Sequence, residues 1–101
     1  MNTDLIHSIF EVSSKERKTL LEQAVKLQEE VGELSAAILV RMKLKGSTKT
    51  TEEAADHVLE ESCDCMLMIM SIMKKNDFTI EQIEDMLAKK LVKWKKVSNI
   101  K

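Results

Sequence analysis

The chain has 101 residues, of which 44% are hydrophobic and 33% charged, and its formal net charge is −1. This length corresponds to one domain, and the near-neutral charge gives no electrostatic reason to expect a nucleic-acid polymer or a membrane as partner. No stretch reaches the roughly 18 apolar residues of a membrane span, and the N-terminus lacks the pattern of a secretion signal, so we expect a cytoplasmic protein. The sequence has no proline and two glycines. Because good helix formers dominate instead, we expect one all-α domain over residues 1–101.

The first two helices are predicted from apolar spacing and from capping patterns. A short helix is expected around Leu5, Ile6, Ile9 and Phe10, and it should end at the serine pair Ser13 and Ser14. Ser13 with Glu16 fits a capping box, which predicts a second helix from about Ser14 to Leu44. Apolar residues three and four apart define its inner stripe: Leu20, Ala24, Leu27, Val31, Leu34 and Ile38.

The third and fourth helices follow a loop at residues 46–50. Thr50 with Glu53 forms a second capping box, which predicts a helix over residues 51–75. Residues 63–73 of that helix are apolar except at two positions, a pattern typical of a helix buried on every side. After a turn at residues 76–77, a third capping box (Thr79 with Gln82) predicts the last helix. Its expected inner face comprises Ile80, Ile83, Leu87, Leu91 and Trp94, and its second half is rich in lysine.

The small size of the domain predicts self-association. A helical domain of this length buries only about 60–65% of the surface that its unfolded chain exposes. We therefore expect a homodimer or a homotetramer in which a second copy completes the apolar faces. Cys63 and Cys65 lie roughly 200° apart around a helix. They can neither bridge each other nor share a zinc ion, and we expect two buried free thiols.

Four acids indicate a metal site. Asp64 lies in the apolar run of the third helix, where burial of an unpaired carboxylate costs several kcal/mol. Glu61 is three residues earlier on the same face, and Glu30 and Glu33 repeat that spacing on the second helix. If these two helices pack antiparallel, the four carboxylates converge. Such oxygen ligands suit Mg²⁺, with Mn²⁺ as the alternative, better than zinc.

The acidic motifs also carry a family resemblance. The segment KLQEEVGEL at residues 26–34, followed by EESCD at residues 60–64, resembles the MazG-like all-α nucleoside triphosphate pyrophosphohydrolases over about residues 20–97. The resemblance implies an antiparallel four-helix bundle that assembles as a dimer or a dimer of dimers. It also implies Mg²⁺-dependent cleavage of (deoxy)nucleoside triphosphates to a nucleoside monophosphate and pyrophosphate.

The resemblance assigns roles by position. Its metal ligands correspond to Glu30, Glu33, Glu61 and Asp64. Its catalytic acids correspond to Glu29 and Glu30, and the expected substrate contacts are Lys26, Lys90, Lys93 and Trp94. Trp94 stands where the family often has asparagine. His57, one turn before Glu61, is a further candidate neighbour of the metal.

Three other functions fit the same sequence features. A phosphoribosyl-ATP pyrophosphohydrolase or a dUTPase-like enzyme would use the same arrangement of metal and acids on a different nucleotide. A non-catalytic helical interaction module would carry the acids only as a charged surface.

Overall fold

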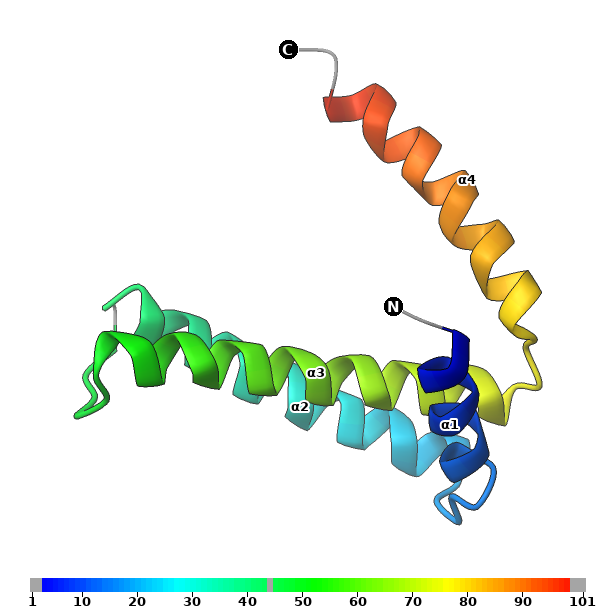
Figure 1. Ribbon diagram of the computed structural model, residues 1–101. Coiled ribbons are helices and arrows are strands. Elements are labelled where there is room, and N and C mark those ends of the chain that lie inside the picture. Colours follow the sequence, from blue (N-terminus) through cyan, green and yellow to red (C-terminus); the bar gives the residue numbers. More distant parts are fainter. Residues whose placement is uncertain (1–2, 44, 99–101) are drawn as a thin grey trace.

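A computed structural model describes residues 3–43 and 45–98. These residues form four α-helices and no strand, which confirms the expected all-α class: α1 (Thr3–Ser13), α2 (Leu20–Arg41), α3 (Thr51–Lys75) and α4 (Ile80–Ser98). Helices α2 and α3 lie side by side and antiparallel, and α1 packs against α3 near the end where α3 leads into α4 (Figure 1). Helix α4 points away and contacts none of the other helices. None of the four helices is both long enough and apolar enough to cross a membrane.

The N-terminus of α2 is set by a capping box that differs from the predicted one. Ser13 is the last residue of α1, and α2 begins at Leu20. The Thr19 side chain accepts the backbone N–H of Glu22 at 3.1 Å, and the Glu22 carboxylate accepts the backbone N–H of Thr19 at 3.0 Å. The hydrogen bond from the Thr19 backbone N–H is the main cause that lowers the pKa of the Glu22 carboxyl. The predicted capping role of Ser13 and Glu16 is therefore wrong, because α1 continues through Ser13.

A residue in the left-handed conformation follows the C-terminal cap of each long helix. Lys43 and Asp77 have φ values of 62° and 60°, the conformation that follows the last helical residue in many C-terminal caps. After α3, the backbone N–H groups of Asp77 and Phe78 donate to carbonyls of the last turn at 2.9 and 3.1 Å. The predicted turn at residues 76–77 is confirmed. Leu44, the predicted end of the second helix, lies outside the described residues.

The buried part of the molecule is small and lies mainly between α2 and α3. Five side chains in the described ranges are buried, with exposed fractions from 1% to 8%: Phe10, Gln23, Ala37, Ala54 and Cys65. Two of them are alanines, whose small side chains allow neighbouring helices to approach closely. Gln23 is the one polar member of this set; it is 1% exposed and donates from α2 to Ser71 of α3.

Several predicted inner faces are exposed. In α3, the run expected to be buried on all sides exposes Cys63, Met66, Leu67 and Ile69. In α2, the predicted stripe exposes Leu20 (44%), Val31 (47%) and Ile38 (40%). In α4, Leu87 (63%), Leu91 (47%) and Trp94 (70%) are exposed. These burial predictions are wrong for the single chain because α3 has only two helical neighbours and α4 has none.

The capping box at the start of α3 predicts a measurable loss of stability. The Thr50 side-chain oxygen accepts the backbone N–H of Glu53 at 3.1 Å, and the backbone N–H of Thr50 donates to the Glu53 carboxylate at 2.9 Å. Thr50→Ala removes one of these bonds and should lower the free energy of unfolding by about 1 kcal/mol, measured by urea denaturation. Thr48→Ala, in the exposed loop, is the matched control. Equal effects of the two substitutions would contradict the capping role.

Candidate metal centre

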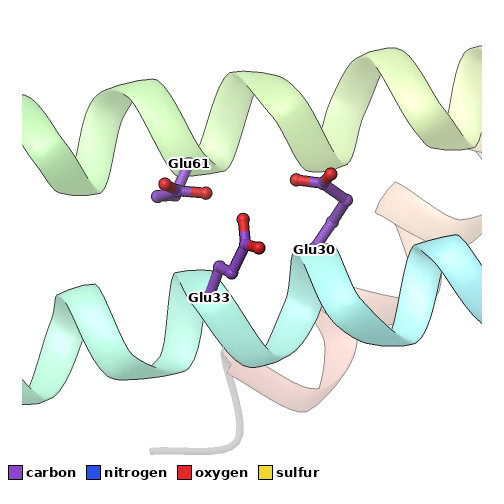
Figure 2. Close-up of side chains that lie close together, drawn as sticks. All are labelled: Glu30, Glu33 and Glu61. Atoms are coloured by element: carbon purple, nitrogen blue, oxygen red, sulfur yellow. The ribbon is translucent and has the colours of Figure 1, made fainter.

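Three carboxylates meet between α2 and α3. Glu30 and Glu33 project from α2, and Glu61 projects from α3 toward them (Figure 2). One carboxylate oxygen of each lies within 4.8 Å of the corresponding oxygens of the other two. We call these three residues the acidic cluster. The antiparallel packing expected from the sequence therefore brings together three of the four predicted metal ligands.

One oxygen of the cluster is buried without a partner. The side chains of Glu30 and Glu61 are each 13% exposed. Glu61 Oε1 lies 3.2 Å from His57 Nε2, whereas Glu61 Oε2 is buried and has no hydrogen-bond partner. A buried carboxylate oxygen that loses water without gaining a partner is costly. A cation held between the three carboxylates would satisfy that oxygen.

The spacing of the cluster fits one divalent ion. At 4.8 Å, two carboxylate charges repel by about 1 kcal/mol in water and by about 3 kcal/mol at the effective dielectric constant of a partly buried site. An octahedral Mg²⁺ separates opposite oxygen ligands by about 4.2 Å. Small side-chain rotations would therefore bring all three oxygens to ligand distance and replace repulsion by attraction. The oxygen-only donor set fits Mg²⁺ or Mn²⁺.

Lys26 supplies a positive charge at the edge of the cluster. Its ammonium lies 3.1 Å from a Glu29 carboxylate oxygen and 3.5 Å from a Glu30 carboxylate oxygen. The hydrogen bond to Glu29, together with the charges of Glu29 and Glu30, raises the pKa of Lys26. The Glu29 side chain is 59% exposed. Lys26 therefore pairs with Glu29 and Glu30, whereas the contact at Glu61 is with the His57 imidazole.

Asp64 lies beside the cluster rather than in it. It is exposed, so the predicted burial of this carboxylate is wrong for the single chain. It does line a groove together with Glu30. Burial raises the pKa of the Cys65 thiol, and the charges of all four predicted ligands raise it further. The predicted fourth ligand therefore lines the groove beside Glu30 but is not among the three carboxylates that meet.

The substrate contacts predicted on the last helix are not at this site in the single chain. Lys90, Lys93 and Trp94 are exposed on α4. Helix α4 contacts none of α1, α2 and α3. Of the predicted substrate contacts, this chain therefore places only Lys26 beside the acidic cluster.

A groove with an apolar lining adjoins the acidic cluster. It lies between α1 and α3, has a volume of about 540 Å³, and includes the carboxylates of Glu16, Glu30 and Asp64 in its lining. This volume is within the range of small-molecule sites. Its apolar wall comprises Ile9, Val12, Leu67 and Met68. An elongated ligand could therefore place an apolar part in the groove and an anionic part toward a metal at the cluster.

A buried side-chain amide is hydrogen-bonded to one of the residues that line this α1–α3 groove. Gln23 Nε2 donates to Ser71 Oγ at 2.9 Å, and Gln23 Oε1 is buried without a partner. Ser71 lines the groove. Because its oxygen accepts from Gln23, its own hydroxyl proton is available to a ligand. Gln23 lies outside the apolar stripe predicted for this helix, and a polar residue gives no signal of burial in an apolar pattern.

Comparison of the chain with protein-family models, curated proteins and solved structures finds no match. The likeness to MazG-like enzymes therefore rests on the spacing of two acidic motifs. The acidic cluster and the groove beside it are therefore the structural features that bear on function.

The cluster predicts stabilisation by divalent metal. Mg²⁺ at ten times its dissociation constant should add about 1.4 kcal/mol to the free energy of unfolding and raise the Tm by several degrees. Glu61→Gln should abolish this shift because it removes the ligand that α3 contributes. Glu60→Gln is the matched control, since Glu60 is the adjacent exposed acid. A wild-type Tm that responds to Mg²⁺ no more than to equal ionic strength of NaCl would contradict the metal site.

Proposed function

We propose that this protein is a Mg²⁺-dependent nucleotide pyrophosphohydrolase of the MazG-like type. It would hydrolyse (deoxy)nucleoside triphosphates to the monophosphate and pyrophosphate. The observation that carries the proposal is the buried, unpartnered Glu61 oxygen in a cluster with Glu30 and Glu33. A cation would reduce the repulsion between these carboxylates and would give the unpartnered oxygen a ligand. Carboxylate-bound Mg²⁺ is a common means of binding polyphosphate in proteins.

The chain supplies groups for the other parts of the reaction. When bound, Mg²⁺ would neutralise phosphate charge and acidify a water molecule. Glu30, Glu33 and Glu61 would hold the ion, with Asp64 as a fourth ligand. The exposed Glu29 carboxylate, next to the cluster, would accept a proton from the attacking water. Lys26 would contact a phosphate oxygen. The water oxygen would bond to the α-phosphorus, the α–β anhydride bond would break, and pyrophosphate would leave.

The α1–α3 groove supports a nucleotide as the substrate. Its acidic end would face the phosphates, and its apolar wall would hold the nucleoside. The free hydroxyl proton of Ser71 fits a carbonyl oxygen of a base. No aromatic side chain in the described ranges lines the groove. Specificity would thus depend on shape and on few polar contacts, which leaves phosphoribosyl-ATP and dUTP as alternatives to be tested beside the common nucleotides.

Self-association is part of the proposal. The exposed apolar side chains on α2, α3 and α4 are more extensive than a small soluble helical monomer usually presents. A homodimer or a homotetramer would bury them. The same surfaces also suit a non-catalytic interaction module, which would need neither Mg²⁺ nor the Glu61 oxygen that lacks a partner.

The enzymatic proposal predicts a defined product. With Mg²⁺ and a panel of nucleoside and deoxynucleoside triphosphates, dUTP and phosphoribosyl-ATP, the protein should release pyrophosphate and a monophosphate. Glu61→Gln and Asp64→Asn should lower kcat/KM by about 100-fold or more with unchanged helicity. Glu60→Gln is the matched control. Release of orthophosphate alone, or no turnover of any compound in the panel, would contradict the proposal.

The groove predicts an effect on substrate selection. Ser71→Ala removes a hydroxyl that belongs to the groove lining and also accepts from the buried Gln23 amide. It should therefore lower the free energy of unfolding and, where the variant is folded, raise KM for the preferred nucleotide about fivefold, the value of one hydrogen bond. Ser62→Ala is the matched control on the same helix, because the Ser62 hydroxyl donates to the Val58 carbonyl at 2.6 Å. Equal kinetics of wild type and Ser71→Ala across the whole panel would show that the groove does not hold the base.

A further inference from the structure

One contact on α3 joins the acidic cluster to a residue outside it. His57 and Glu61 are four residues apart, so their side chains are neighbours on one face of the helix. His57 Nε2 lies 3.2 Å from Glu61 Oε1. An ionised carboxylate can only accept hydrogen bonds, so the proton of this contact belongs to the imidazole. His57 therefore donates from Nε2 to one oxygen of the Glu61 carboxylate.

This hydrogen bond uses one oxygen of Glu61 and leaves the other for the cluster. Glu61 Oε2 is buried without a partner, and the side chain projects from α3 toward Glu30 and Glu33 (Figure 2). A glutamate side chain has considerable rotamer freedom, and repulsion by the two other carboxylates favours its rotation away from them. The bond from His57 opposes that rotation, because turning Glu61 away would break it.

The other nitrogen of the His57 ring has an unfavourable environment. Nδ1 is buried without a hydrogen-bond partner, although the side chain as a whole is 32% exposed. A buried polar atom without a partner lowers stability. An apolar side chain at this position would avoid that loss. The imidazole is therefore better explained by the bond from Nε2 to Glu61 than by a contribution to the stability of α3.

The ring of His57 is not placed as a ligand of the cluster. Among the described residues, the ligand atoms that lie within 4.8 Å of one another are carboxylate oxygens of Glu30, Glu33 and Glu61. The Nε2 atom of His57 is already engaged with Glu61 Oε1. Any effect of His57 on a cation in the cluster would thus be transmitted through the Glu61 carboxylate.

We propose that His57 is a positioning residue that holds the Glu61 carboxylate with Oε2 directed at the metal. Side chains that hydrogen-bond a metal ligand orient that ligand, and their loss typically weakens metal binding by about 10–100-fold. The effect on the metal rests on the proposed Mg²⁺-dependent function. The orientation of Glu61 in the metal-free protein does not rest on it.

The orientation of Glu61 is tested first without metal. Three-bond couplings measured by NMR on ¹³C-labelled protein report the rotamer of this side chain. Wild type should show one dominant rotamer, and His57→Leu should show averaging over several. His57→Gln should keep one rotamer, because a glutamine amide can also donate to a carboxylate one turn away. Averaged couplings in the wild type, or one rotamer in all three proteins, would overturn the positioning role.

Binding of Mn²⁺, followed by electron paramagnetic resonance, tests the consequence for the metal. His57→Leu should raise the Kd for Mn²⁺ by about 10–100-fold, whereas His57→Gln should bind nearly as tightly as the wild type. The Tm of metal-free His57→Leu should not fall, because the substitution removes the unpartnered Nδ1. His7→Leu, at an exposed position of α1, is the matched control and should leave the Kd unchanged.

Other outcomes would overturn the proposal. A histidine with only a structural role predicts that His57→Leu lowers the Tm and leaves the Kd unchanged. Equal loss of binding in His57→Leu and His57→Gln would show that the hydrogen bond is not what matters. Coupling of ¹⁴N to Mn²⁺ that disappears in His57→Leu would make His57 a ligand instead. If the wild type binds no Mn²⁺, the proposed function fails, and the metal-free couplings still decide whether His57 orients Glu61.

Discussion

The packing of α2 against α3 holds three carboxylates at a distance where they repel one another. Glu30, Glu33 and Glu61 have oxygens within 4.8 Å, and one Glu61 oxygen is buried without a partner. The two helices approach through a seam that includes small side chains and through the Gln23–Ser71 hydrogen bond. The favourable packing of α2 on α3 therefore offsets the repulsion between the three carboxylates. In the proposed metal centre, a divalent cation between the three carboxylates would replace this repulsion by attraction.

The second constraint is the small amount of burial in the single chain. Among the described helices, α3 packs against α1 and α2, and α4 packs along none of the other three. The acidic cluster consequently lies near an open side, where Glu33 and Asp64 reach solvent. An oligomer would cover the exposed apolar faces, and it would also enclose the acidic cluster.

The positions of the helices were largely predictable from the sequence, whereas the burial of their faces was not. The boxes of Thr50 and Thr79 are local hydrogen-bond patterns, so the starts of α3 and α4 could be read from a few letters. The start of α2 was misplaced because Ser13–Glu16 and Thr19–Glu22 satisfy the same pattern, and α1 continues through Ser13. Asp64 was expected to be buried because its neighbours are apolar. An apolar pattern indicates which face of a helix favours burial. It does not indicate whether the helix that covers this face belongs to the same chain.

The candidate site was predictable in part. Paired i, i+3 acids on two antiparallel helices were sufficient to bring Glu30, Glu33 and Glu61 together. Spacing along one helix cannot reveal partners across helices, so the Gln23–Ser71 bond and the α1–α3 groove were not foreseen. His57 was considered only as a metal neighbour, whereas its contact with Glu61 Oε1 leaves the other oxygen of that carboxylate for a cation.

The most direct test of this account is a crystal structure with Mn²⁺, using anomalous diffraction to locate the ion. The account predicts an anomalous peak between the carboxylates of Glu30, Glu33 and Glu61, with Glu61 Oε2 as one of the ligands. If crystals grown with millimolar Mn²⁺ show no peak there, and the three side chains point apart into solvent, the metal centre does not exist. The proposed reaction would then lose its basis.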